Sequence, residues 1–178
     1  MPFAVELALD EVASKTIDCI RNDLAKQKIT NESNQSGMHP HITLAIYEKL
    51  DCILCEQELS ILVHDLHEMK FVFSHFGIFT HPENVLFLAP TMTQELFHLH
   101  RQVHTCLANQ SVDSWPLYHA DNWVPHCTLT FGVEITNLPR ALDIALKQKL
   151  PLDATAISLG VTEFYPAKNA FRIPLKTA

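Results

Sequence analysis

The sequence predicts one α+β domain made of two similar lobes, and three observations support that fold class. The chain has 178 residues, of which 47% are hydrophobic, enough to bury one core of useful size. Along it, the spacing of apolar residues switches repeatedly between a period of two, typical of strands, and one of about 3.6, typical of helices. The order of these segments also repeats. We therefore place the lobes at roughly residues 1–90 and 91–178 of a single domain spanning 1–178, an arrangement that allows terminal strands to be exchanged.

The first half is predicted to form a strand, a helix, a strand, a helix and two strands. Alternating apolar residues indicate the strands, and Asp10 or Glu11 opens the first helix. Turn-forming residues from Thr30 to Gly37 predict an exposed loop. The predicted bounds are a strand at Phe3–Leu9, a helix to about Gln27, a strand at His39–Tyr47, a helix at Ile53–Met69, and strands at Phe71–Thr80 and Val85–Ala89 around the turn His81–Asn84.

The second half repeats this order, as a helix, a strand that carries a histidine, a helix and two strands. Two copies of one unit would place two similar lobes face to face. The predicted bounds are a helix at Thr93–Asn109, a strand at His126–Val133, a helix at Pro139–Leu150, and strands at Ile157–Tyr165 and Ala170–Leu175 around the turn Pro166–Asn169.

The charge balance and hydropathy restrict the partners. The formal charge is −7, from 13 Lys+Arg against 20 Asp+Glu, and the sequence has no basic cluster. Long nucleic acids usually bind to a basic face, so we expect any phosphate partner to be small. No apolar run approaches the roughly 20 residues of a membrane helix, and Glu6 and Asp10 interrupt the start of the chain. We expect a cytoplasmic protein with no membrane contact. A monomer is expected, although the sequence leaves the oligomeric state open.

The most specific feature is a repeated five-residue signature. Pro-His-Ile-Thr-Leu occupies residues 40–44, and Pro-His-Cys-Thr-Leu occupies residues 125–129. About 0.006 such matches are expected by chance from this composition, and here two occur at equivalent points of the repeated order. The alternative is that the threonines are merely β-forming residues and the histidines merely edge residues of strands. The duplication favours a functional role over this alternative.

The spacing of this signature has a physical meaning. Residues two apart on a strand point to the same face, so His41 projects with Thr43, and His126 with Thr128. If the two strands lie side by side, four groups converge on one site. A neutral imidazole can take a proton from water while the opposite imidazolium gives one to a leaving oxygen, and the threonine hydroxyls can bind phosphate oxygens. Such chemistry needs no metal, and the sequence indicates neither a metal site nor a cofactor.

The paired His-x-Thr signatures, one in each half of a short chain, resemble those of the 2H phosphoesterase superfamily, which includes 2'-5' RNA ligase-like and cyclic phosphodiesterase proteins. The similarity in element order covers nearly the whole chain. It implies a bilobal, pseudo-symmetric fold in which two antiparallel β-sheets line a central cleft, with helices outside. It also implies metal-independent hydrolysis of 2',3'-cyclic phosphates on nucleotides or RNA ends, commonly giving 2'-phosphates.

The resemblance also implies a role for each residue of the motif. His41 would be the general acid toward the leaving oxygen and His126 the general base for water. Thr43 and Thr128 would hold the phosphate. Several members carry a basic residue shortly after the second motif, whereas this chain has Thr130–Gly132. This difference favours a nucleotide or short oligonucleotide with a cyclic phosphate over long RNA.

Other residues have weaker signals. Tyr118 and Trp123 lie in the loop that precedes His126 and are candidates for stacking on a base, although such aromatic residues are more often core or rim. His39 shares the face of His41 and could help to bind substrate, or be merely solvated. His100 and His104 have the i, i+4 spacing of metal ligands without an evident third ligand, so a structural role is the better interpretation.

Three alternative functions remain open from the sequence. The same mechanism could cleave or form 2'-5' phosphodiester bonds on oligonucleotides. The chain could be a non-catalytic nucleotide-binding module, although both motifs are complete. The 11 histidines could also belong to a metal-binding protein.

Overall fold

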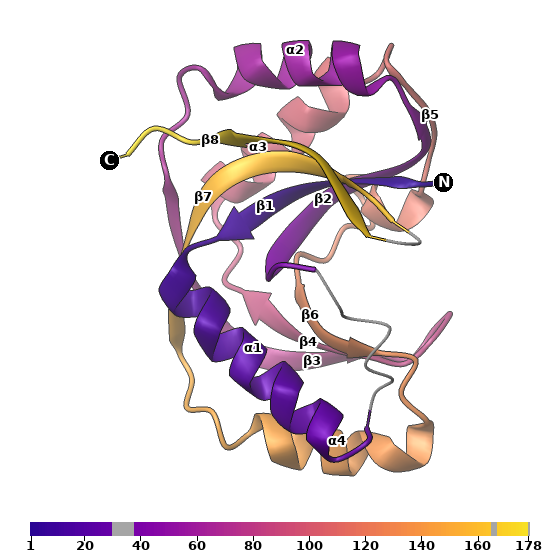
Figure 1. Ribbon diagram of the computed structural model, residues 1–178, viewed down its shortest axis with the longest axis vertical. Helices are drawn as coiled ribbons and strands as arrows, with labels where there is room; N and C mark the ends of the chain where they lie inside the picture. Colours follow the sequence, from indigo (N-terminus) through magenta and orange to yellow (C-terminus); the bar gives the residue numbers. More distant parts are fainter. Residues whose placement is uncertain (30–37, 165–166, 178) are drawn as a thin grey trace.

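The computed structural model describes residues 1–29, 38–164 and 167–177 (Figure 1). The loop predicted at Thr30–Gly37 lies outside these residues, as do Tyr165 and Pro166 of the predicted closing strand and turn. The elements, in chain order, are β1 (Phe3–Leu9), α1 (Glu11–Lys26), β2 (His41–Leu50), α2 (Cys52–Val63), β3 (Met69–Phe79), β4 (Val85–Pro90), α3 (Gln94–Cys106), β5 (Ser111–Ser114), a 3₁₀ turn at Pro116–Tyr118, β6 (Cys127–Phe131), a 3₁₀ turn at Ile135–Asn137, α4 (Leu138–Ala145), β7 (Leu152–Glu163) and β8 (Lys168–Pro174).

The strands of the described residues form one sheet in the order β5-β2-β1-β7-β3-β4-β6, with β8 also paired to β7. All of the pairings are antiparallel. The long strand β7 joins two halves of this sheet, because its residues 156–163 pair with β1 and its residues 152–156 pair with β3. The predicted α+β class with antiparallel sheets is confirmed, and the two sheets are continuous through β7.

The halves of the sheet are not the halves of the chain. Strands β3 and β4 lie with β6, and β5 lies with β2, so each half of the sheet combines strands from both sides of residue 90. Helices α1 and α4 lie against the half that contains β6, and α2 and α3 lie against the half that contains β2 and β8 (Figure 1). The exchange between halves therefore involves internal strands as well as terminal ones.

The helices begin where the sequence provides an aspartate. The Asp10 carboxylate accepts hydrogen bonds from the backbone N–H groups of Val12 and Ala13 and caps α1, and Asp51 caps α2 in the same way. Helix α2 ends at Val63 rather than at the predicted Met69. The backbone N–H of Glu68 donates to the Lys176 carbonyl, and this pairing with the C-terminal segment replaces further helical hydrogen bonds.

Two other differences from the predicted elements lie in the second half of the chain. Strand β5 was not predicted, because Ser111–Ser114 has no alternation of apolar residues; it forms by pairing with the end of β2. Helix α4 ends at Ala145, and β7 begins earlier than predicted, at Leu152. Within the described part of the chain, no helix combines the length and the apolar character that crossing a membrane requires.

Candidate active site

The two His-x-Thr segments face one cavity of about 430 Å³. His41 is the first residue of β2, and His126 immediately precedes β6. The alternation expected of strands is present, because the intervening and following residues are fully buried in the core. These buried residues are Ile42, Leu44, Cys127 and Leu129. The residues that line the cavity from the two segments are His41, Thr43, His126 and Thr128.

The two histidines make equivalent hydrogen bonds. Nδ1 of His41 lies 2.6 Å from the carbonyl oxygen of His39, and Nδ1 of His126 lies 2.7 Å from the carbonyl oxygen of Val124. A carbonyl can only accept, so each Nδ1 carries a proton and each Nε2 is left for proton exchange. The intervening prolines restrict the residue before them to extended backbone, which orients these carbonyls.

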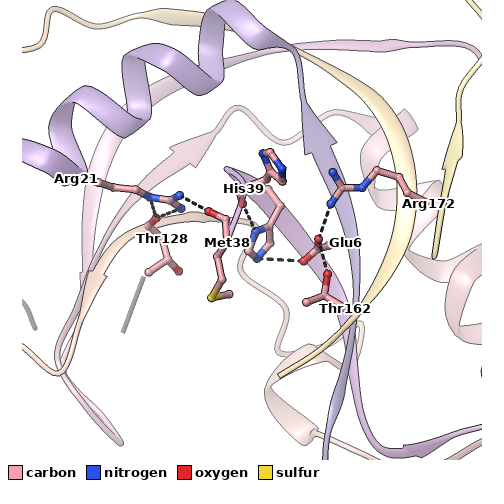
Figure 2. Close-up of polar contacts among 8 residues, drawn as sticks. Glu6, Arg21, Met38, His39, Thr128, Thr162 and Arg172 are labelled. Atoms are coloured by element: carbon pink, nitrogen blue, oxygen red, sulfur yellow. Dashed lines mark hydrogen bonds and ion pairs between the residues drawn. The ribbon is translucent and has the colours of Figure 1, made fainter. Parts of the chain in front are cut away.

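The surroundings of His41 are polar. Its Nε2 lies 3.6 Å from Oε2 of Glu6 on β1, and both side chains are almost completely buried. Oε1 of the same carboxylate accepts hydrogen bonds from Thr162 Oγ1 at 2.8 Å and Arg172 Nη2 at 3.0 Å (Figure 2). Sequence reasoning did not find Glu6 as a site residue. The available signal was a single carboxylate within the otherwise apolar strand Phe3–Leu9.

The surroundings of His126 are apolar. Its ring contacts the rings of Phe79 and Phe87, with centroids 5.0 and 5.3 Å away. Burial is the main cause that lowers the pKa of His126; the hydrogen bond with the Val124 carbonyl opposes this, and the charge of His41 lowers it further. The two histidines therefore differ in environment, although their motifs and Nδ1 contacts match.

Arg21 of α1 connects the two motif segments. Its guanidinium donates to the carbonyl oxygen of Thr128 and, through Nη1 at 3.0 Å, to that of Met38 (Figure 2). Met38 precedes β2, whereas Thr128 lies on β6 in the other half of the sheet. Arg21 is only 8% exposed, and besides these backbone groups its Nη1 contacts the Asp18 carboxylate at 3.3 Å. Arg21 was not among the predicted site residues, because a single charged residue in a predicted helix gives no signal of such a role.

Both predicted aromatic candidates line the cavity. Burial raises the pKa of Tyr118 to about 12, against the effect of its side-chain hydrogen bond with Thr43. Trp123 donates from Nε1 to the Thr43 carbonyl at 3.0 Å, and its ring stacks on His100 at a centroid distance of 4.0 Å. These contacts fix Trp123 in the cavity wall next to β2. Trp115, whose ring contacts Phe164, also lines the cavity and was not among the predicted candidates.

The two histidines with the i, i+4 spacing of metal ligands have structural contacts. Nε2 of His100 lies 2.9 Å from the Tyr118 carbonyl, and Nε2 of His104 lies 3.2 Å from the Leu44 carbonyl. Burial lowers the pKa of His100 to about 4 and also lowers that of His104. Across residues 1–29, 38–164 and 167–177, no three His, Cys, Asp or Glu side chains gather closely enough to hold a metal ion.

An antiparallel sheet in two joined halves, with a His-x-Thr segment from each half facing one cavity, defines the class of two-histidine phosphoesterases. The sequence matches the 2'-5' RNA ligase superfamily over residues 9–164, and the chain belongs to that superfamily of 2H phosphoesterases. A search of curated proteins gave no match.

The fold is similar to several solved structures. The crystal structure of E. coli LigT in apo form has 14% sequence identity, covers 98% of this chain and 97% of its own, and gives a TM-score of 0.65. E. coli LigT complexed with 3'-AMP has 13% identity, with coverages of 97% and 96% and a TM-score of 0.62. The protein TT0787 of Thermus thermophilus has 12% identity, covers 99% of both chains and gives a TM-score of 0.63. At these identities the likeness concerns the fold.

Proposed function

We propose that this protein hydrolyses 2',3'-cyclic phosphodiesters on nucleotides or RNA ends, with His41 and His126 as the proton donor and acceptor and without a metal. The observation that carries the proposal is the equivalent geometry of the two imidazoles. Each has Nδ1 fixed by a backbone carbonyl, and both rings line one cavity, which leaves two Nε2 atoms for one substrate.

The proposed reaction transfers one proton at each histidine. Neutral His126 accepts a proton from a water molecule as the water oxygen forms a bond to phosphorus. Protonated His41 gives a proton to the ribose oxygen as the P–O bond of the ring breaks. The product is a ribose phosphomonoester. The hydroxyls of Thr43 and Thr128 donate to the non-bridging oxygens, where negative charge increases in the transition state. The apolar surroundings and lowered pKa of His126 support its role as the base.

The lining of the cavity supports a small substrate. Its volume of about 430 Å³ and its aromatic residues, among them Tyr118 and Trp115, fit one nucleoside with its phosphate. The net charge of −7 favours a mononucleotide or short oligonucleotide over a long polyanion. E. coli LigT has been crystallised with 3'-AMP, NADP+ and ATP, and these complexes are in line with a ligand of nucleotide size.

The test is a substrate panel of the four 2',3'-cyclic nucleotides, ADP-ribose cyclic phosphate and 2'-5' oligoadenylate. His41→Ala and His126→Ala should each lower kcat by about 10²-fold or more while leaving the circular dichroism spectrum unchanged. His98→Ala, which removes an exposed histidine of α3, is the matched control and should keep wild-type turnover. Near-normal activity in either motif variant would refute the acid–base assignment.

The second candidate function is cleavage or formation of 2'-5' phosphodiester bonds, which the family match favours. The mechanism would be unchanged and only the linkage would differ. Product analysis by chromatography separates the two: oligoadenylate consumed with cyclic nucleotides untouched would favour this candidate. Binding of a nucleotide without turnover of any member of the panel would instead favour a non-catalytic binding module.

A further inference from the structure

Glu6 is a buried charge that lies beside the proposed site. Its side chain is 4% exposed, and the other residues of β1 near it are buried and apolar. A buried carboxylate stays ionised only when charged or hydrogen-bonding partners replace water. Arg172 of β8 and Thr162 of β7 supply these partners, and both contact Oε1 (Figure 2).

The sheet register brings these residues together. Glu6 pairs with Thr43 on one side and with Gly160 on the other. Gly160 in turn pairs with Arg172. A Cβ atom at position 160 would lie 2.7 Å from the Phe171 carbonyl oxygen and 3.2 Å from the Arg172 Cα, so glycine allows β8 to approach closely enough for Arg172 to reach Glu6.

The second carboxylate oxygen, Oε2, faces His41. Its distance of 3.6 Å from Nε2 is longer than a direct hydrogen bond, so the interaction is electrostatic. Water screens it little, because both side chains are nearly buried. His126 has two phenylalanine rings in the corresponding surroundings.

The other charged or titratable groups near His41 come from three segments: β8, α1 and the start of β6 with the residue before it. Arg172 of β8 lies beyond Glu6, on its Oε1 side. Arg21 of α1 contacts the Met38 carbonyl just before the motif. His126 is close enough for the charge of His41 to lower its pKa, and the buried thiol of Cys127 hydrogen-bonds the backbone of His41. Among the described residues, Glu6 is thus the one whose carboxylate lies within 4 Å of a ring nitrogen of His41.

We propose that Glu6 keeps His41 protonated between turnovers and thereby makes His41, and not His126, the proton donor. This inference rests on the proposed function. Glu6 is a positioning residue, because it acts through His41 and does not itself exchange a proton with the substrate. After His41 has given its proton to the leaving oxygen, the carboxylate favours recovery of a proton from solvent.

Glu6→Gln tests the inference, because it keeps the shape of the side chain and removes its charge. The donor must be protonated, and the imidazolium is less stable without the carboxylate. The kcat/KM of E6Q relative to wild type on the 2',3'-cyclic nucleotide that wild type cleaves fastest should therefore fall as the pH rises. We expect a loss within about threefold at about pH 6 and of about tenfold or more at about pH 8.

Thr162→Val is the matched control. It removes one hydrogen bond from the same carboxylate and leaves the charge in place, so any loss should be the same factor at every pH. If the ratio of kcat/KM for E6Q to that for wild type is constant across pH, the inference is overturned and Glu6 has only a structural role. The same pH-dependent loss in T162V would also overturn it.

Two further measurements keep the outcomes distinct. If E6Q does not fold because Arg172 is left without its carboxylate, E6Q/R172Q removes both charges and should show the same pH-dependent loss. Binding of 3'-AMP, measured by calorimetry over the same pH range, does not require turnover. If wild type binds 3'-AMP but cleaves none of the panel, the proposed function is refuted. The inference about Glu6 is then tested by binding alone: it holds if the affinity of E6Q for 3'-AMP falls more steeply with rising pH than that of wild type, and it is overturned if the two fall in parallel.

Discussion

The guanidinium of Arg21 donates two hydrogen bonds to the carbonyl oxygen of Thr128, from Nη2 at 2.7 Å and from Nε at 3.1 Å. Its third contact, to the Met38 carbonyl, reaches the segment that leads into the other motif. A helix side chain therefore links β6 to the segment that leads into β2, and these two strands are not neighbours in the sheet.

Arg21→Met should lower kcat by about 10–100-fold, because a displacement of about 1 Å between catalytic groups has effects of that size. It should also lower the free energy of unfolding by about 1–3 kcal/mol, since two carbonyls lose their donor. Steady-state kinetics and urea denaturation measure the two effects. Leu24→Ala, a core truncation on the same helix, is the control: it should destabilise the fold by about 2–5 kcal/mol and largely spare kcat well below the melting temperature. Equal losses of kcat in both variants would show that Arg21 has no particular role in the site.

Gly77→Ala tests the packing behind His126. A Cβ atom at this position would lie 2.3 Å from the ring of Phe87, which stacks on Phe79 and contacts His126. The ring must move, so we expect a loss of about 1–3 kcal/mol in the free energy of unfolding and a lower kcat. The double variant G77A/F87L, in which a smaller side chain makes room, should recover part of the stability. If the double variant recovers no stability, the strain in G77A does not arise from the contact with the Phe87 ring.

Trp123→Phe removes the N–H that donates to the Thr43 carbonyl and keeps an aromatic ring against His100. The unpaired carbonyl should lower the free energy of unfolding by about 1–3 kcal/mol. Trp115→Phe is the matched control, because it loses an N–H that donates to the exposed Glu48 carboxylate, and we expect a change below about 1 kcal/mol. Thermal unfolding of the two variants compares them directly, and equal losses would contradict the role given to the Trp123 hydrogen bond.

The pH dependence of stability should reflect His100. Burial lowers its pKa to about 4 in the folded protein, whereas an unfolded histidine titrates near about 6.5. The unfolded chain thus binds the proton more readily, so the stabilisation is present above about pH 6.5 and is lost as the pH falls toward 4. The lowered pKa values of His104 and His126 act in the same direction.

We expect the Tm to fall by roughly 5 °C or more between about pH 7 and about pH 4.5. His100→Gln should reduce this fall, and His98→Gln, at an exposed position on the same helix, should leave it intact. Scanning calorimetry at several pH values provides the measurement. An undiminished fall in H100Q would assign the dependence to other groups.

The parts of the site that the sequence predicted are those set by local geometry. The two-residue period of a strand is enough to place His41 beside Thr43, and the duplicated motif pointed to a shared cavity. Glu6 and Arg21 were missed because their partners lie far along the chain: Arg172 is 166 residues from Glu6, and Thr128 is 107 residues from Arg21. Their meaning depends on which strands become neighbours.

The same distinction applies to the fold. Capping by Asp10 and Asp51 is local, and helices α1 and α2 begin where the sequence indicates. The end of α2 and the existence of β5 depend on pairing with distant segments, and the sequence alone does not show these pairings. The interleaving of strands from both sides of residue 90 has the same origin.

Ala156 of β7 pairs with Leu9 of β1 and also with Met69 of β3, so the two halves of the sheet meet at one residue. A chain cut near residue 90 would therefore not yield two self-sufficient fragments, since neither piece would contain all the strands of a half. Each fragment would hold one of the two site histidines, His41 or His126, and an open sheet edge that its counterpart must cover. Complementation between separately made pieces would therefore restore both halves of the sheet together or neither of them. The pair of site histidines is brought together only in the reassembled chain.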